Sequence, residues 1–352
     1  MMVAPRLLKF SEAIREATHV VMHENPNVSV LGLGVTDPLG VFQTTKGLEA
    51  AFPGRVIETP TAENGVMGFA IGSALVGMRP IVTHQRVEFS LLAIEQIANQ
   101  AAKWNYMTGG LASMPIVIRL IIGRGWGQGP QHSQSLDPLF AHIPGLKVIA
   151  PATPFDAKGM LIAAVRDNNP VVMLEHRWLH NINGEVPSKA YETPIGEARV
   201  ARIGKDLTIA TYSYMVTEAL MAAELLAQHN IEVEVIDIRS HRPMDIDTIF
   251  QSVKKTGHLI TLDNGWTKFG VGSQVISEIV GRDLTVLKAN PARLGIEDTP
   301  IPSTRALANV AYPGQRTIIE AVASQLKCDM SHLDKQIQNV QDTPNRLFTG
   351  PF

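Results

Sequence analysis

Two residues of this chain combine a side chain that can do chemistry with an unusual local sequence. One is Glu63, in the stretch ETPTAENGVMGFAIGSALVGM, where nearly all residues from 65 to 74 are small or apolar. A helix of this composition can pack its backbone close to another element, and Gly68 and Gly72 share one of its faces. Glu63 near its start is either a desolvated carboxylate with a specific nitrogen partner or an ordinary first-turn glutamate favoured by the helix dipole.

The other residue is His132, in the stretch GWGQGPQHSQS at 125–135, which contains four glycine and proline positions. A dinucleotide-binding fingerprint would need a glycine at position 128, which is Gln, so a phosphate cradle is excluded by the spacing. The stretch follows the apolar run MPIVIRLII, and ligands bind at the ends of parallel strands. His132 is therefore a candidate catalytic residue, and a structural histidine in a turn is the alternative.

A third cluster lies in EVIDIRSHRPMD, where Asp237, Arg239, His241 and Arg242 follow one another at a predicted strand end. An ion-paired strand end that stabilises its domain is the favoured interpretation there. Other histidines lack metal-ligand spacing, only one cysteine is present, and no G-x-S-x-G motif occurs. The sequence therefore predicts neither a zinc site nor an α/β-hydrolase.

The elements that must position these residues alternate between short β-branched runs and helical stretches. Apolar runs lie at 27–35, 79–84, 114–122, 146–152 and 170–176. The stretch EFSLLAIEQIANQAAKWNY carries an apolar stripe at i+4 spacing, and TPFDAKGMLIAAVRDNN opens with a plausible cap, Thr153, and Pro154. This pattern predicts an α/β fold with two parallel-sheet domains. The expected boundaries are 1–180 for the first domain, 181–205 for a linker, 206–325 for the second domain and 326–352 for a tail.

Composition narrows the class of protein further. The chain has 352 residues, 45% of them hydrophobic and 18% charged, with a net charge of -2, so no basic field favours nucleic acid or an anionic membrane. A single cysteine, Cys328, indicates a reducing compartment, and we expect a cytoplasmic protein. The first residues suggest an amphipathic helix rather than a signal peptide, and no apolar run is long enough to span a bilayer.

Six motifs in order resemble one known family. They are GVFQTTKGL, RVIETPTAENGVMGFAIGSALVGMRPIV, GPQHSQS, FAHIPGLKVIAPATPFDAKGMLIAAVRDNNPVV, VIDIRSHRPMD and EDTPIPS, and the match runs from about Phe10 to Val322. The chain resembles the β subunits (E1β) of thiamine-diphosphate-dependent 2-oxo acid dehydrogenases of the pyruvate, branched-chain and acetoin types. The resemblance implies a thiamine pyrimidine-binding domain followed by a transketolase C-terminal-type domain.

The resemblance also implies roles for individual residues. Glu63 matches the glutamate that hydrogen-bonds N1′ of the thiamine aminopyrimidine and favours its imino form, and His132 matches the active-site histidine of the QHSQ loop. Arg86 and Phe89 lie where the family contacts the cofactor. The decarboxylated acyl unit of a 2-oxo acid would then pass to a lipoyl domain of an E2 acyltransferase.

A missing motif is equally informative. Thiamine enzymes hold the diphosphate and Mg²⁺ with a GDG…N segment, and this chain has no GDG. The resemblance therefore implies that an α-type E1 subunit supplies that half of the site in an α2β2 assembly, without which the chain is inactive. It further implies a structural potassium ion with Asp167 and Asn169 as side-chain ligands; helix capping by Asp167 is the slightly favoured alternative.

Two positions depart from the family pattern. Leu33 stands where most members carry an acidic residue, and Arg86 stands where most carry an aromatic one. An arginine can stack on a ring or bind a substrate anion. These departures favour an alternative function, a two-chain thiamine enzyme of transketolase or acyloin-synthase type that transfers its unit to an aldehyde or sugar. A catalytically silent partner is a third hypothesis, which the intact Glu63 and His132 argue against.

Overall fold

The computed structural model describes residues 6–124, 127–330 and 333. Within them, internal contacts divide the chain into two units, and we describe each by itself. The first comprises residues 6–122 and 139–195, and the second the described parts of 123–138 and 196–333. The segment 123–138 follows a strand of the first unit, yet its contacts group it with the second unit. The domain boundaries expected from the sequence, which place 1–180 in one domain, do not anticipate this.

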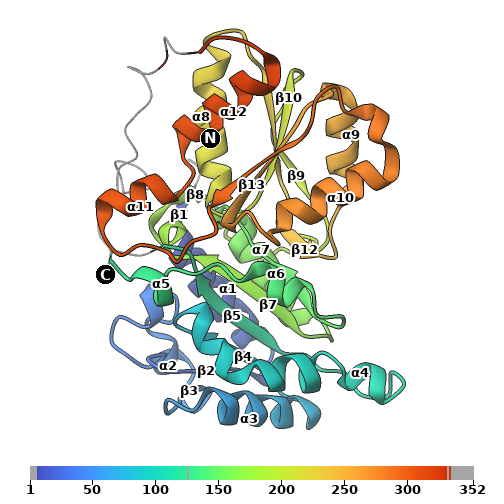
Figure 1. Ribbon diagram of the computed structural model, residues 1–352. Helices are drawn as coiled ribbons and strands as arrows, with labels where there is room; N and C mark the ends of the chain where they lie inside the picture. The colour runs from blue at the N-terminus through green and yellow to red at the C-terminus, as the bar shows by residue number, and fades with distance from the viewer. Residues whose placement is uncertain (1–5, 125–126, 331–332, 334–352) are drawn as a thin grey trace, which may run out of the picture. The chain divides into compact units, whose positions relative to one another are not determined.

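The first unit is built on a parallel sheet with the strand order β6-β7-β5-β4-β2-β3, drawn in blue to green in Figure 1. Every residue of β2, β5 and β7 is buried, as expected for strands covered on both faces. All five apolar runs expected in this half form strands. The elements are β1 (Leu7–Lys9), α1 (Phe10–Glu24), β2 (Val28–Gly32), η1 (Val41–Gln43), α2 (Leu48–Ala51), β3 (Val56–Glu58), α3 (Glu63–Leu75), β4 (Arg79–His84), η2 (Val87–Ala93), η3 (Gln96–Ala101), α4 (Trp104–Met107), β5 (Val117–Ile122), β6 (Lys147–Ile149), α7 (Pro154–Arg166), β7 (Val171–His176), η4 (Arg177–Asn181) and β8 (Asn183–Glu185).

Helix α7 begins as its sequence predicts. Thr153 is the N-cap, its hydroxyl oxygen accepts the backbone N–H of Asp156 at 3.1 Å, and Pro154 takes the first helical position. This bond satisfies one of the backbone donors that a helix start leaves without an intrahelical partner. Helix α7 packs against α1, and the two helices cover part of the sheet.

The stretch predicted as one amphipathic helix at 88–106 differs in detail. It consists of the 3₁₀ segment η2, the π-helical segment η3 and the short helix α4. The N–H of Ala102 reaches the carbonyl of Ile97, five residues back, at 3.1 Å. The middle of the predicted apolar stripe is buried, since Ala93, Ile97 and Ala101 are at most 1% exposed, whereas Phe89 and Trp104 at its ends are only partly buried. Burial of the stripe was predictable from spacing, whereas the change of helix type was not, because it depends on the packing around it.

The second unit carries a smaller sheet with the order β14-β13-β10-β11-β9. Its first four strands are parallel, and β9 pairs with β11 antiparallel. The stretch 181–205, expected to be a linker, contains two strands. Strand β8 pairs with β1 in the first unit, and β9 is the edge strand of the sheet in the second unit. The elements, green to red in Figure 1, are α5 (Gly129–His132), β9 (Arg199–Arg202), β10 (Leu207–Thr211), α8 (Met215–Ala227), β11 (Val233–Asp237), β12 (Ser240–Arg242), α9 (Ile246–Thr256), β13 (Leu259–Trp266), α10 (Val271–Asp283), η5 (Leu284–Val286), β14 (Ala292–Ile296), α11 (Arg305–Ala311) and α12 (Gln315–Leu326), while α6 (Asp137–Ala141) crosses the division.

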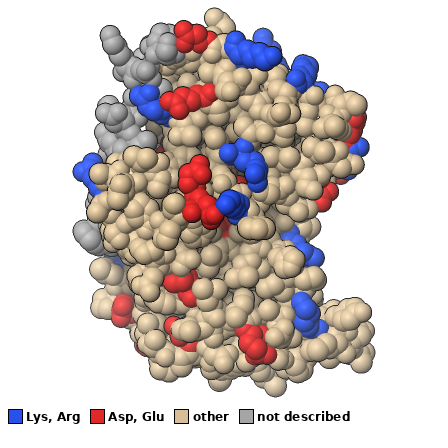
Figure 2. Space-filling view, viewed as in Figure 1, with Lys and Arg blue, Asp and Glu red and all other residues tan. Residues whose placement is uncertain are grey.

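One face of the molecule carries charges of both signs. Figure 2 shows basic and acidic side chains scattered over an otherwise uncharged face, without a broad patch of one sign. None of the helices in the described part of the chain is both long and apolar enough to cross a membrane. Most of the predicted tail, 326–352, lies outside the described residues.

Candidate functional site

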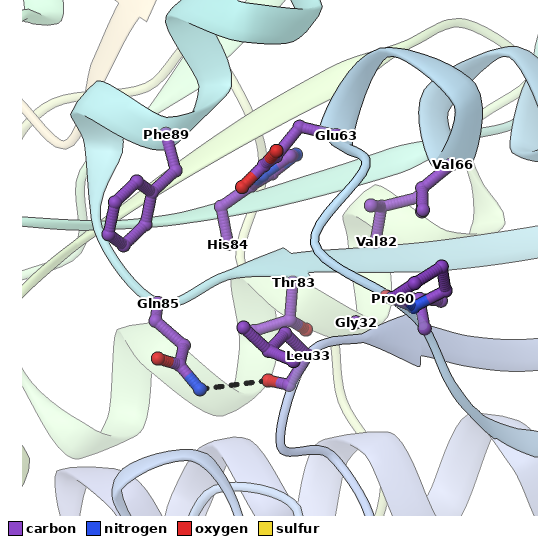
Figure 3. A pocket seen from close by; sticks show the side chains of 11 residues that line it. Gly32, Leu33, Pro60, Glu63, Val66, Val82, Thr83, His84, Gln85 and Phe89 are labelled. Atoms are coloured by element: carbon purple, nitrogen blue, oxygen red, sulfur yellow. Dashed lines mark hydrogen bonds between the residues drawn. The ribbon is translucent and has the colours of Figure 1, made fainter.

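A hollow that is partly open to solvent lies at the carboxyl ends of β2 and β4 in the first unit, and the space in it that water-sized molecules can occupy is about 30 Å³. This edge of a parallel sheet is where ligands bind in α/β folds. Apolar side chains surround a few polar ones, as in small-molecule sites generally (Figure 3). The lining residues are Gly32, Leu33, Thr59, Pro60, Glu63, Val66, Val82, Thr83, His84, Gln85 and Phe89.

Glu63 is the first residue of α3 and lines this hollow. It is half-buried, and its carboxylate makes no hydrogen bond or ion pair with the residues that the structure describes. Figure 3 shows the side chain directed from α3 into the hollow. The helix start favours a negative charge, and the carboxylate is available to a ligand that carries a donor.

His84 also lines the hollow, although sequence reasoning did not single it out. It ends the buried strand β4 and is 5% exposed. Burial alone lowers the pKa of its imidazole to about 4, so the ring is neutral at physiological pH. Its Nε2 is buried without a hydrogen-bond partner. The available signal was its position, a polar residue at the carboxyl end of an apolar strand.

The loop after β2 is held in place from two directions. Glu58 accepts the backbone N–H of Gly34 at 2.6 Å and the hydroxyl of Thr36 at 2.9 Å. Desolvation opposes the charge of Glu58, but these hydrogen bonds outweigh it and hold its pKa below the usual value. The amide of Gln85 donates to the carbonyl of Leu33 at 3.0 Å, as Figure 3 shows. The wall that carries Leu33 is therefore fixed before any ligand binds.

Gly32 allows β2 and β4 to approach closely at the floor of the hollow. A Cβ at this position would lie 2.5 Å from the carbonyl oxygen of Thr83, closer than real Cβ contacts. Any larger residue would push the strands apart or move Thr83. The glycine therefore preserves the shape of the site.

The two residues predicted beside Glu63 have different positions. Phe89, in η2, lines the hollow and presents an aromatic ring to it (Figure 3). Arg86 precedes η2, is 5% exposed and is not among the lining residues. A contact of Arg86 with the cofactor stays a prediction.

His132 belongs to the second unit, at the end of the four-residue helix α5, and is partly buried. Gly125 and Trp126 of its stretch lie outside the described residues. Position 129 of this stretch needs a glycine for two reasons. Its φ is +62°, and a Cβ there would collide with Ser303. A backbone approach to the EDTPIPS motif therefore requires glycine at this position.

The cluster singled out at 237–242 is occupied by contacts within the second unit. Asp237 accepts a bond from Arg199 at 3.0 Å, and Arg239 donates to the carbonyl of Glu197 at 3.1 Å. His241 lies 3.4 Å from Asp137, measured from Nε2 to Oδ1. These contacts agree with the favoured structural interpretation of the cluster.

The predicted potassium ligands lie at the end of α7. Asp167 forms an ion pair with Lys147 and accepts the backbone N–H of Asn169 at 2.9 Å. Arg79 donates to the carbonyls of Val165 and Asp167 at 2.8 and 2.9 Å. Lys147 and Arg79 thus contact acceptors at this position, and a potassium ion with Asp167 and Asn169 as side-chain ligands stays a prediction. Among the described residues, no group of three or more His, Cys, Asp and Glu is placed to hold a metal ion.

Comparison with known proteins gives a consistent answer. The family model of the transketolase pyrimidine-binding domain matches residues 7–181, and that of the transketolase C-terminal domain matches residues 196–318. The chain is also similar, with a TM-score of 0.75 and 24% identity over 91% of its length and 98% of the other chain, to a solved split-gene transketolase described as an inactive β4 tetramer. That likeness supports the fold.

Curated relatives are closer in sequence. The chain is 40% identical to the acetoin:2,6-dichlorophenolindophenol oxidoreductase subunit β of Cupriavidus necator, over 92% of this chain and 98% of the relative. It is 40% identical to the pyruvate dehydrogenase E1 component subunit β of Rickettsia felis, over 88% of this chain and 96% of that relative. It is also 40% identical to the mitochondrial pyruvate dehydrogenase E1 component subunit β of Bos taurus, over 92% of each chain. Similarity at this level extends over both units.

Proposed function

Because the chain belongs to the family of E1 β subunits, with transketolase-type pyrimidine-binding and C-terminal domains, we propose that it provides the pyrimidine half of a thiamine diphosphate site. The enzyme so formed decarboxylates a 2-oxo acid and transfers the acyl group to a lipoyl acceptor. The observation that carries the proposal is Glu63 at the start of α3, with its carboxylate directed into the hollow.

The hollow suits an aminopyrimidine ring. Such a ring is flat and apolar on its faces, and the walls offer Phe89, Val66 and Val82. Its nitrogen edge needs a hydrogen-bond partner, and the hollow offers the carboxylate of Glu63. The residues present therefore fit this group.

Bound thiamine diphosphate would supply the electron sink that loss of CO₂ from a 2-oxo acid requires. The task of Glu63 is to hold and release a proton at the ring nitrogen N1′, and the largely apolar hollow strengthens that hydrogen bond. Leu33, Val66 and Val82 exclude water from the ring. We assign to His132 a hydrogen bond to the substrate or a proton transfer to the acceptor.

The partner is an α-type subunit that holds the diphosphate and Mg²⁺. The missing GDG motif supports this, and so does uncovered apolar surface around α3. Phe69 is 61% exposed, Val76 82% and Leu92 65%, and apolar residues exposed on neighbouring elements suit a surface that a partner covers. Gly65 and Gly72 of α3 have no atom within 4 Å of a built Cβ among the described residues, so a partner backbone has room to approach.

The alternative acceptor is an aldehyde or sugar. Leu33 favours it, because the residue lines the hollow where most relatives of the resembled family place an acidic side chain. Adding a lipoyl domain to the decarboxylating complex separates the two functions. Reductive acylation of that domain supports the lipoyl role, whereas carbon–carbon bond formation with an aldehyde supports the alternative.

The central test is Glu63→Gln in the chain co-expressed with the one encoded beside it. We expect exchange of the thiamine C2 proton, followed by NMR, to fall by about 10²- to 10⁴-fold. Decarboxylation of 2-oxo acids with 2,6-dichlorophenolindophenol as electron acceptor should fall in parallel. Undiminished exchange would remove the assigned role of Glu63, and tight Mg²⁺-dependent cofactor binding by the single chain would contradict the divided site.

A further inference from the structure

His84 is a polar group that the proposed reaction does not yet use. It ends β4, is 5% exposed, and lines the same hollow as Glu63. Its Nε2 is buried without a hydrogen-bond partner in the described structure. A buried nitrogen in this state costs stability, so its retention at the site calls for an explanation.

Glu63 has the complementary need. Its carboxylate has acceptor positions for several donors, while a ring nitrogen would take up only one. The side chain finds no partner among the described residues, and Figure 3 shows Glu63 of α3 and His84 of β4 on the same hollow, where they overlap in this view. When a ring fills the hollow and expels water, Glu63 loses the solvent around its carboxylate, while Nε2 of His84 is already buried without a partner in the described structure.

We propose that His84 is a positioning residue for Glu63, its neutral Nε2–H donating a hydrogen bond to the carboxylate when the pyrimidine ring is bound. One hydrogen bond then satisfies both groups and fixes the carboxylate oxygen that faces N1′. Because burial lowers the pKa of His84 to about 4, the ring donates without adding a positive charge. The inference rests on the proposed function, since it assumes that the ring lies beside Glu63.

Several charged groups surround the end of β4. The elements packed against the end of β4 are α3, β5, β2 and η2. Their charged residues near this end are Glu63, Arg119 of β5, which is in register with Thr83, and Arg86 and Glu88 at η2. Arg119 is bound to Glu175 at 2.6 Å, and burial is what lowers the pKa of His84.

The test is a double-mutant cycle on thiamine diphosphate binding by the co-purified complex with Mg²⁺, measured by calorimetry. His84→Phe, which keeps an aromatic ring but removes the nitrogen, should weaken binding about five- to tenfold. His84→Gln, which restores an N–H donor, should recover most of the loss. In the Glu63→Ala background, which removes the acceptor, His84→Phe should have no further effect, because the two residues act together.

The outcomes separate the hypotheses. If His84→Phe binds thiamine diphosphate as tightly as the wild type, the positioning role is overturned. If the effects of the two substitutions on binding are additive, the positioning role is also overturned, in favour of a direct contact between His84 and the ring. If Glu63→Gln itself leaves binding and C2 proton exchange unchanged, the proposed function fails instead. Thr261→Val, which removes another unpartnered buried polar atom in the second unit, is the matched control and should leave the dissociation constant unchanged.

Discussion

Asp137, Asp263, Tyr212 and His241 form a buried polar cluster in the second unit, and all are at most 5% exposed. The hydroxyl of Tyr212 donates to Asp263 at 3.3 Å, and its ring packs edge-on against His241 with centroids 4.3 Å apart. Sequence reasoning singled out His241 as a neighbour of Arg239, whereas the fold pairs it with Asp137, about a hundred positions earlier. At this scale the partner of a side chain is decided by residues distant in the sequence.

Asp263 makes the cluster sensitive to pH. Desolvation, assisted by the nearby charge of Asp137, raises the pKa of Asp263 to about 7. The folded state therefore binds more protons than the unfolded state between about pH 4 and pH 7, and this group's contribution to stability falls as pH rises through that window.

We predict that Asp263→Asn flattens this dependence. The variant should lose less thermal stability than the wild type between pH 5 and pH 7, since it has no carboxylate to ionise. Melting temperatures at several pH values provide the measurement. Asp298→Asn, at an exposed ion pair, should retain the wild-type slope; the same slope in Asp263→Asn would contradict the assignment.

At the scale of elements, a buried ion pair joins β5 and β7 in addition to their backbone hydrogen bonds. Arg119 binds Glu175 through two bonds of 2.6 and 2.9 Å, and both side chains are fully buried. Desolvation opposes the charge of Glu175, but Arg119 outweighs it and lowers the pKa of that carboxyl to about 2. The stability that this pair contributes is present above the unfolded pKa and is lost as pH falls through about 2.

We predict that Arg119→Met destabilises the first unit by about 3–5 kcal/mol, because it leaves the Glu175 charge buried without its partner. Replacing both residues, as in Arg119→Met with Glu175→Leu, should recover most of the loss because no charge remains buried. Urea unfolding of the three proteins provides the measurement. A double variant less stable than the single one would show that the pair is worth more than its burial cost.

At the scale of the whole molecule, the chain has the features of one member of an assembly. Its family membership, its missing diphosphate motif and the uncovered apolar residues around α3 agree on this point. A soluble protein rarely leaves such residues uncovered unless a partner covers them.

We predict that Phe69→Glu on α3 abolishes co-purification with the α-type chain while the isolated variant stays folded. A buried, unpaired carboxylate would oppose docking, whereas a solvated one on the free chain costs little. Pull-down and circular dichroism provide the measurement. Ile203→Glu, at a residue that is also highly exposed, is the control and should co-purify normally; unchanged assembly by Phe69→Glu would place the interface elsewhere.

From the sequence alone, the apolar runs of the first half predict its buried parallel strands, Thr153 and Pro154 predict the start of α7, and Glu63 is expected near a helix start. These features depend on neighbours along the chain, and local pattern is enough to predict them. The six motifs identify the family for the same reason. The tertiary structure decided that His84 enters the hollow, that 123–138 groups with the second unit and that His241 meets Asp137. Each of these depends on contacts between segments far apart in sequence, whose pairing no local periodicity specifies.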